Sequence, residues 1–261
     1  MQKKLSAANK TAWETKAYQA WERTYGTPEA LAKELKRTHK HLLRYWLKYI
    51  GDPAGRRVLN LLGSNGRKAV SLALMGAAVT VVDISEENHL YAMRTAEAAG
   101  VRIDYLCADA TDIPDEEKLG QFDIVLMEFG ILHYFAELDP IFSTVCERLK
   151  PGGRLLLTDF HPFARIWKSF EERRTPGDYF DRTFREGDVA FAQLLPEEDR
   201  GGLNKVMTRG WTVGDIIAAI SKTGLLVRAF EEFPASSAPG LPEFYTLVAD
   251  KIEAKLPPLH P

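Results

Sequence analysis

Acidic and histidine side chains recur in this sequence directly after short apolar runs. Asp83 closes the run VTVVD, Asp109 follows IDYLCA, and Glu128 closes FDIVLME. His133 lies in GILHYF and His161 in DFHPF. A carboxylate can accept hydrogen bonds from a vicinal diol or an exocyclic amine, and a neutral imidazole can accept a proton from a hydroxyl group. These side chains could together bind a nucleoside and deprotonate an acceptor.

The elements that would position these side chains alternate between strand and helix from residue 57 to residue 160. Strands are expected at 57–62, 79–83, 103–108, 122–127 and 154–159, with helices at 67–75, 85–99 and 140–149. The strands are continuous apolar runs, as expected when both faces of a sheet are covered. Alternation of this kind predicts an α/β fold with a parallel sheet and right-handed crossovers. Ligands of such sheets bind beyond the carboxyl ends of the strands, so the acidic and histidine side chains should share one edge.

Helical patterns precede this alternation, and an irregular stretch follows it. Trp13, Trp21 and Tyr25 lie on one face of a helix over 11–25, and Thr27-Pro28 begins a second helix that runs to about Ile50. After a helix at 212–223, strands are expected at 225–230 and 244–250. The predicted parts are a helical cap (1–50), a Rossmann-like core (51–160), an inserted substrate cover (161–210) and a C-terminal part that completes the sheet (211–261).

Composition narrows the class of protein. The chain has 261 residues, 45% hydrophobic, with a formal net charge of −2, which gives no general attraction to nucleic acid. Cys107 and Cys146 are too sparse for a disulfide framework, so reduced thiols and a cytoplasmic location are expected. No leader peptide is evident, no apolar run approaches the ~18 residues of a membrane span, and the histidines do not have metal-ligand spacing. We therefore expect neither a membrane anchor nor a metal site.

The order of five segments resembles the class I S-adenosylmethionine-dependent methyltransferases, and most of all their small-molecule branch. These segments are VLNLLGSNGRKAV, VTVVDIS, CADATDIP, FDIVLMEFGILHYF and LKPGGRLLLTDF. LKPGGRLLL and the acidic end of VTVVD are the more specific pieces. The resemblance covers residues 57–160 closely and 211–251 more loosely. It implies a doubly wound sheet of seven strands with the last antiparallel, S-adenosylmethionine as cofactor, and methyl transfer to a small-molecule acceptor through oxygen, nitrogen or carbon.

The first loop departs from the family pattern of an acid followed by glycines at alternate positions. The acid is replaced by Asn60, the first glycine by Leu62 and the second by Ser64, and only Gly66 is kept. Gly63 falls between the usual glycine positions. We expect either a shifted loop in which Gly63 takes the unusual dihedral angles or a slightly displaced cofactor. Glu128, which ends the adjacent strand, could supply the charge that Asn60 lacks.

The resemblance assigns roles to the other positions. The backbone of Leu62 to Ser64 would face the methionine portion of the cofactor. Asp83 and Ile84 would hold the ribose and one side of the adenine, and Asp109 and Ala110 would meet the adenine edge. Local structure offers alternatives, because Asp83 could help cap the next helix and Asp109 could bond its own backbone.

Catalysis and acceptor binding involve fewer residues. His133 and His161 are the possible general bases, needed only if the acceptor must lose a proton. Tyr18 and Tyr134 are expected to line an apolar acceptor pocket. Each of these four side chains could instead serve only local packing. The sequence specifies no oligomeric state.

Three other functions compete with this interpretation. An RNA or protein methyltransferase could use the basic stripe of Lys33, Arg37, Lys40, Arg44 and Lys48, although a solvated amphipathic helix explains the same pattern. A non-catalytic cofactor-binding module would explain the altered glycine loop. A nicotinamide dehydrogenase ranks last, because the glycine spacing that brings backbone close to a pyrophosphate is absent.

Overall fold

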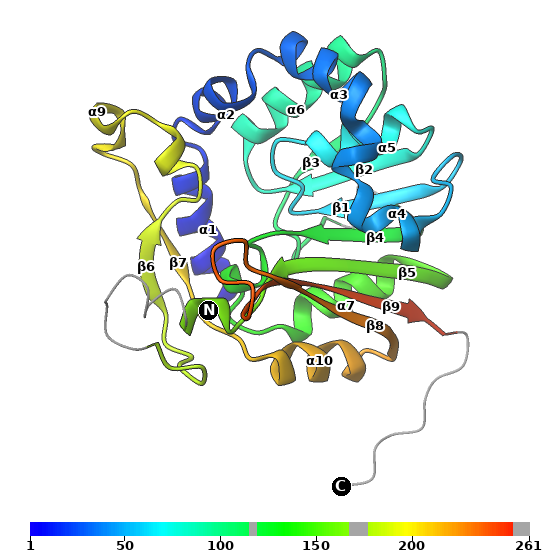
Figure 1. Cartoon of the computed structure of the whole chain (residues 1–261), viewed down its shortest axis with the longest axis vertical. Helices are drawn as coiled ribbons and strands as arrows, with labels where there is room; N and C mark the ends of the chain where they lie inside the picture. Colours follow the sequence, from blue (N-terminus) through cyan, green and yellow to red (C-terminus); the bar gives the residue numbers. More distant parts are fainter. Residues whose placement is uncertain (115–118, 167–176, 253–261) are drawn as a thin grey trace, which may run out of the picture.

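A mixed sheet of seven strands lies at the centre of the computed structural model, which describes residues 1–114, 119–166 and 177–252. The strand order is β3-β2-β1-β4-β5-β9-β8 (Figure 1). The strands are β1 (Arg57–Leu61), β2 (Ala78–Asp83), β3 (Asp104–Cys107), β4 (Phe122–Glu128), β5 (Leu149–Phe160), β8 (Leu225–Pro234) and β9 (Pro242–Lys251). β9 pairs antiparallel with both of its neighbours, and the pairs among β1 to β5 are parallel. The predicted seven-stranded sheet with an antiparallel last strand is confirmed.

Both faces of the sheet are buried, which explains why its strands are continuous apolar runs. Neighbouring residues of a strand point to opposite faces. Val58 and Leu126 belong to one hydrophobic core, whereas Leu59 and Val125 belong to the other. Because β1 pairs in parallel with both β2 and β4, the carboxyl ends of these three strands lie along one edge of the sheet.

Helices cover the two faces (Figure 1). One face carries α3 (Pro28–Leu42), α4 (Arg44–Ile50), α5 (Arg67–Leu74) and α6 (Glu86–Ala99), and the other carries α7 (Asp139–Arg148) and α10 (Val213–Lys222). Trp46 of α4 is buried and donates a hydrogen bond from Nε1 to Oγ1 of Thr158 on β5, at 2.8 Å. The helices before β1 thus share a core with the sheet.

Each of the two helices expected before residue 50 is divided. The first ends at Trp13 as α1 (Gln2–Trp13), and Lys16, with φ of 65°, precedes α2 (Ala17–Tyr25). The second begins where predicted, because the Thr27 side chain accepts a hydrogen bond from the Ala30 N–H, but it breaks at Leu43 between α3 and α4. The spacing of apolar residues did not indicate either break, because that spacing stays close to helical across both.

The irregular stretch contains a small sheet of its own. β6 (Arg185–Asp188) and β7 (Lys205–Thr208) form an antiparallel pair, joined through η3 (Ala192–Leu194) and α9 (Glu197–Arg200). α1 lies beside β7 (Figure 1). The Asn9 amide makes a double contact with Met207, donating to its carbonyl at 3.3 Å and accepting from its N–H at 2.8 Å. No described helix is both long enough and apolar enough to cross a bilayer.

Candidate active site

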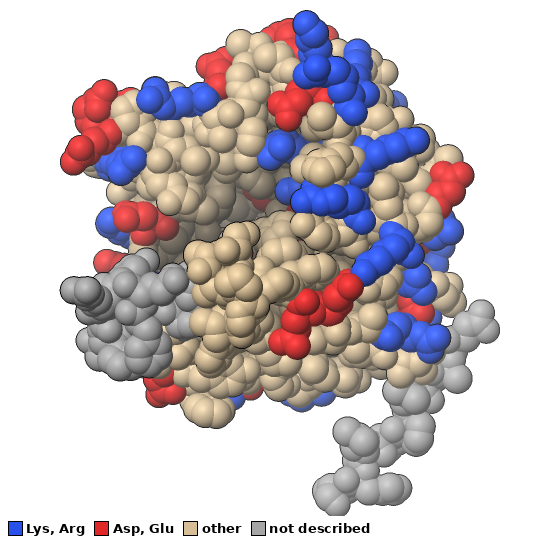
Figure 2. All heavy atoms as spheres, in the orientation of Figure 1, with Lys and Arg blue, Asp and Glu red and all other residues tan. Residues whose placement is uncertain are grey.

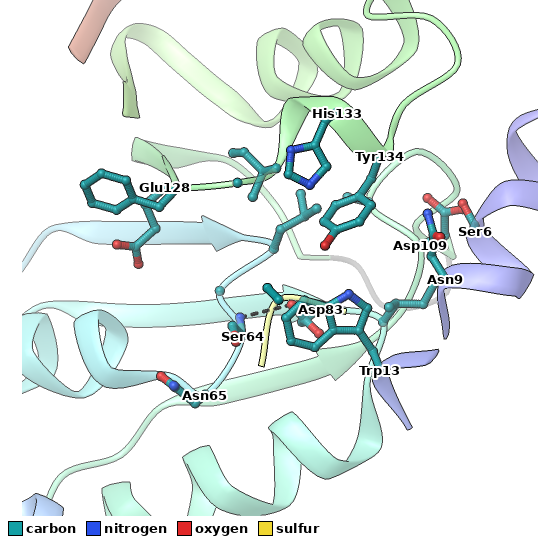
Figure 3. Close-up of a pocket in the computed structure, with 18 of the residues that line it drawn as sticks. Ser6, Asn9, Trp13, Ser64, Asn65, Asp83, Asp109, Glu128, His133 and Tyr134 are labelled. Atoms are coloured by element: carbon teal, nitrogen blue, oxygen red, sulfur yellow. Dashed lines mark hydrogen bonds between the residues drawn. The ribbon is translucent and has the colours of Figure 1, made fainter. Parts of the chain in front are cut away.

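A cavity of about 330 Å³ lies over the carboxyl ends of β1, β2 and β4. The surface is hollowed beside α1 (Figure 2), and the lining side chains converge on this space (Figure 3). Four residues of α1 form one wall, and they recur at the spacing of a helical face: Gln2, Ser6, Asn9 and Trp13. Eight of the expected cofactor residues line the cavity: Leu62, Gly63, Ser64, Asp83, Ile84, Asp109, Ala110 and Glu128.

The first loop takes its unusual conformation at different residues from the one expected. Leu62 (φ 52°) and Ser64 (φ 47°) are left-handed, whereas Gly63 is not. Gly63 is required for space instead, since a Cβ there would lie 2.7 Å from both Oδ1 of Asn60 and Cγ1 of Val81. The expectation that Gly63 takes the unusual dihedral angles is therefore wrong, and the loop is strained at its two flanking side-chain-bearing residues.

Two expected cofactor residues do not line the cavity. Asn60 is fully buried beneath Gly63 and donates to the Leu126 carbonyl at 3.3 Å. Gly66, with φ of 72°, is the N-cap residue of α5, and a Cβ there would lie 2.6 Å from Cβ of Ala92. Both residues therefore support the loop without lining the cavity. Asn60 packs against Gly63, whose main chain separates it from the cavity.

The Asp83 carboxylate ties the ends of β1 and β2 together. Its Oδ2 accepts from the Ser64 N–H at 3.0 Å, and its Oδ1 accepts from the Ser85 N–H at 3.0 Å and the Asn88 amide at 3.1 Å. Burial raises the pKa of Asp83, and these hydrogen bonds oppose the rise. Asp83 also lines the cavity, so a ligand hydroxyl can approach the carboxylate from that side.

Asp109 has its expected local role and also lines the cavity. Oδ1 accepts from the N–H of Thr111 at 2.8 Å and from its hydroxyl at 2.8 Å, which is the local loop role. The same side chain also lines the cavity (Figure 3). The turn therefore fixes a carboxylate at the cavity wall.

Glu128 is buried at the end of β4 and has a cationic partner that the sequence did not suggest. Its Oε2 lies 2.9 Å from Nζ of Lys68, in the first turn of α5. Lys68 also lines the cavity. The cavity thus holds one carboxylate and one ammonium group side by side, which suits the two opposite charges of an amino-acid zwitterion.

The short helix η2 (Leu132–Tyr134) after β4 is fixed by Asp159, another residue missed from the sequence. This carboxylate is only 4% exposed, yet it accepts four main-chain N–H bonds between 2.6 and 3.3 Å, from Gly130, Ile131, Leu132 and Phe160. Gln2 holds the same segment from α1, accepting from the Ala136 N–H at 2.7 Å. The sequence shows Asp159 as a strand end but gives no sign of the N–H groups around it.

His133 and Tyr134 project from η2 into the cavity (Figure 3). Loss of hydration lowers the pKa of His133 below its ordinary 6.5; the Asp159 charge raises that pKa and Arg165 lowers it further. The imidazole is therefore neutral at pH 7. Burial raises the pKa of Tyr134, so its hydroxyl stays protonated.

A second cavity, of about 260 Å³, lies on the other side of η2. His133 and Phe160 line both cavities. The imidazole of His133 therefore stands at their junction.

His161 and Tyr18 lie away from the first cavity. Nδ1 of His161 accepts from the Phe163 N–H at 3.1 Å, and its Nε2 lies 3.0 Å from Oε1 of Glu232. With both nitrogens engaged, the ring has no free lone pair for a substrate proton, and it lines only the second cavity. The Tyr18 ring packs edge-on against Tyr91, and its hydroxyl accepts from Arg94. Tyr18, which was expected in the acceptor pocket, lines neither cavity, and His161, a possible general base, lines the second.

One group of potential metal ligands occurs among the described residues, outside both cavities. The ligand atoms of Glu86, His89 and Cys107 lie within 4.8 Å of one another. The Cys107 thiol donates to Glu86 at 3.1 Å, and burial with this contact raises its pKa to about 12. The thiol is therefore protonated at neutral pH.

Known proteins resemble this chain in sequence and fold. A family model described as a methyltransferase domain matches residues 58–153. A demethylmenaquinone methyltransferase of Thermus thermophilus is 31% identical over 153 residues, covering 56% of this chain and 67% of the relative. A ubiquinone biosynthesis O-methyltransferase of Xanthomonas axonopodis pv. citri is 34% identical over 115 residues, covering 43% of this chain and 47% of the relative. The chain thus spans between about half and two thirds of these relatives.

Solved structures extend the similarity of fold. The magnesium protoporphyrin IX methyltransferase of Synechocystis, solved with bound S-adenosylhomocysteine, matches with a TM-score of 0.61 at 16% identity. That match covers 94% of this chain and 99% of the other. The shared fold therefore extends beyond the part matched by the family model.

Proposed function

This chain belongs to the class I S-adenosylmethionine-dependent methyltransferases, and we propose that it transfers a methyl group from S-adenosylmethionine to a hydroxyl oxygen of a small-molecule acceptor. One observation carries the choice of oxygen: the neutral imidazole of His133 stands where the cofactor cavity meets a second cavity. An oxygen nucleophile must lose a proton during transfer, and a neutral imidazole at that point can accept it.

The residues of the first cavity fit the cofactor. Glu128 would accept from the ammonium of its methionine portion and Lys68 would pair with the carboxylate, so the zwitterion replaces the contact between these two side chains. Asp83 would accept from one ribose hydroxyl on its cavity side, and Asp109 would meet the adenine edge. S-adenosylmethionine supplies an electrophilic methyl group, and orientation of the two reactants provides much of the rate.

The chain's own residues would then move one proton. His133 takes it from the acceptor hydroxyl as the oxygen attacks, while Asp159 keeps η2, and with it the imidazole, in place. The Tyr134 hydroxyl stays protonated and does not act as a base. Gln2 and Trp13 of α1 shield the site from water.

A small acceptor is favoured over a macromolecule. The two relatives are named for quinones, and one name specifies transfer to oxygen. The basic stripe that motivated the nucleic-acid alternative is divided between α3 and α4, and Lys48 is paired with Glu231 of β8 at 2.6 Å. We also propose a cytoplasmic location, on the two free cysteines Cys107 and Cys146.

Calorimetric titration of the purified chain with S-adenosylmethionine tests the cofactor site. We expect micromolar binding, weakened about tenfold in Glu128→Gln and unchanged in the matched control Glu97→Gln, which is exposed on α6. Equal affinities in both variants would remove Glu128 from the site. Formation of S-adenosylhomocysteine with phenolic acceptors, but not with their methyl ethers, tests the reaction, and turnover on the ethers would contradict transfer to oxygen.

A further inference from the structure

The second cavity contains a fully buried hydroxyl that no described residue binds. Tyr245 of β9 is 0% exposed and lines this cavity, yet its hydroxyl makes no hydrogen bond to a described residue. The ring is held by stacking on Phe230 at 5.0 Å between centroids. Burying an O–H group without a hydrogen-bond acceptor costs free energy. The presence of the Tyr245 hydroxyl in this wall therefore points to a ligand that accepts a hydrogen bond from it.

Two arginines bring cationic groups to the same cavity. The Arg209 guanidinium lies 4.1 Å from the Trp211 ring centroid, and its Nη1 donates to the Ala136 carbonyl at 2.7 Å. Its Nε is buried and makes no hydrogen bond to a described residue. Arg165 lies against Gly210, where an added Cβ would sit 1.5 Å from Nη1 of Arg165. The fold thus places the Arg165 guanidinium beside the residue that follows Arg209.

The Arg165 guanidinium has charged neighbours of its own, the carboxylates of Asp178 and Asp181. The hydrogen bonds of the Arg165 guanidinium to the carbonyls of Tyr179 and Asp181 are long, at 3.4 and 3.5 Å, and burial lowers its pKa. Asp159 is the acidic residue in the cavity wall, and its four main-chain N–H donors already occupy both oxygens. His161 adds a further imidazole, which faces Glu232.

We propose that the second cavity binds a carboxylate group of the methyl acceptor, through Arg209, Arg165 and the Tyr245 hydroxyl. The acceptor is then a hydroxy acid whose hydroxyl reaches His133 at the junction of the two cavities, so this inference rests on the proposed function. A planar carboxylate matches the fork of a guanidinium group. A phosphate dianion would be repelled more strongly by Asp159.

Calorimetry with paired probes tests the assignment without relying on turnover. The probes are 4-hydroxybenzoate, 4-hydroxyphenylacetate and 4-hydroxycinnamate, each beside its methyl ester, titrated into the full chain with S-adenosylhomocysteine present. We expect at least one acid to bind about tenfold or more tightly than its ester. Equal binding of every acid and ester would overturn the inference, as would tighter binding of 4-hydroxyphenyl phosphate than of any acid.

Single substitutions test which side chains bind the carboxylate. Arg209→Gln and Arg165→Gln should abolish the preference for acid over ester, while Arg102→Gln, an exposed arginine outside both cavities, should keep it. Tyr245→Phe should keep or raise the melting temperature, since it removes an unpartnered hydroxyl, yet weaken acid binding several-fold. If Arg209→Gln fails to fold, Arg165→Gln and Tyr245→Phe decide, and unchanged acid binding in both would overturn the proposal.

The failure of this inference differs from failure of the proposed function. Methyl transfer to the esters at the same rate as to the acids would overturn the carboxylate site and leave methyl transfer intact. Acid-selective binding with no methyl transfer to any probe would support the carboxylate site and count against transfer to a hydroxyl oxygen.

Discussion

At the scale of single residues, the loops that line the first cavity have strained backbone. Leu62, Ser64 and Phe129 all have positive φ, between 47° and 52°, at the ends of the adjacent strands β1 and β4. A left-handed residue with a side chain costs about 1–2 kcal/mol, and such strain collects at functional sites. The altered glycine loop therefore adopts its path at an energetic cost.

Replacing Ser64 by glycine should release part of this strain. We expect Ser64→Gly to raise the free energy of unfolding by about 1 kcal/mol, measured by denaturant unfolding. Ser143→Gly is the matched control, because Ser143 is exposed in α7 and should lose about 0.5 kcal/mol. Equal losses in both variants would mean that the left-handed conformation at Ser64 stores no strain.

The protonation of His133 should govern the pH dependence of the reaction. Because its pKa is lowered below 6.5, the rate should stay level near pH 7 and fall only at lower pH, as the imidazole becomes protonated. His133→Gln should lower kcat by about 10²-fold or more and remove that acid limb, with S-adenosylmethionine affinity retained. An unchanged acid limb in the variant would exclude His133 as the base.

The lowered pKa of His133 also makes the free energy of unfolding depend on pH. Below pH 6.5 the unfolded chain binds a proton at His133 that the folded chain does not yet bind. The free energy of unfolding therefore falls as the pH drops below 6.5, until the lowered pKa is passed. His133→Gln should flatten this part of the melting-temperature profile.

At the scale of elements, η2 is positioned by hydrogen bonds from three directions. Asp159 binds its main chain from β5, Gln2 from α1, and the Trp211 indole donates to the Leu132 carbonyl at 2.9 Å. A short 3-10 helix has little stability of its own, so these partners determine where His133 lies. η2, β5 and α10 each contribute a residue to the wall of the second cavity: Leu132, Asp159 and Ile216.

Asp159→Asn should therefore disorder η2 more than it harms the sheet. The amide would turn an N–H group toward main-chain donors, and we expect a loss of about 3 kcal/mol in the free energy of unfolding. Amide hydrogen exchange over residues 129–135 should become faster than the loss of global stability alone would produce. Asp139→Asn, an exposed carboxylate paired with Lys222, is the control and should change neither quantity by more than about 0.5 kcal/mol.

The sequence predicted the central strands and their acidic ends because apolar runs and turn residues are local signals. It missed the division of the N-terminal helices and the wall formed by α1, although Gln2, Ser6, Asn9 and Trp13 have helical spacing. Gln2, Ser6 and Asn9 are polar, and only their contacts with β7 and η2 show why this face is directed inward. Asp159 and Lys68 were missed for the same reason: their partners are distant in sequence.

At the scale of the whole molecule, the cavity is enclosed by parts that are far apart in the sequence, from Gln2 to Ala190. α1 supplies one wall, the sheet supplies the floor, and the Asn9–Met207 contact joins α1 to β7. A ligand in the cavity would contact α1 and the ends of the central strands at once. Binding should therefore stabilise the fold as a unit.

S-adenosylhomocysteine at about 100 times its dissociation constant should add about 2.7 kcal/mol to the free energy of unfolding. For a chain of this size that corresponds to a rise in melting temperature of about 5–10 °C. Asn9→Ala should reduce this rise, while Asn204→Ala, at an exposed position, should not. A rise that is equal in both variants would show that α1 closes on the site without the Asn9 contact.

The position of β9 has a consequence for the synthesis of the molecule. β9 lies between β5 and β8, with antiparallel pairing on both sides. While residues 242–251 are still inside the ribosome, β5 has an open edge and β8 has no neighbour. The first five strands can assemble during translation, but Tyr245 and the wall it provides arrive last. A chain released before residue 242 would have open strand edges, which promote aggregation. Because Tyr245 belongs to β9, the second cavity and the sheet are completed by the same strand.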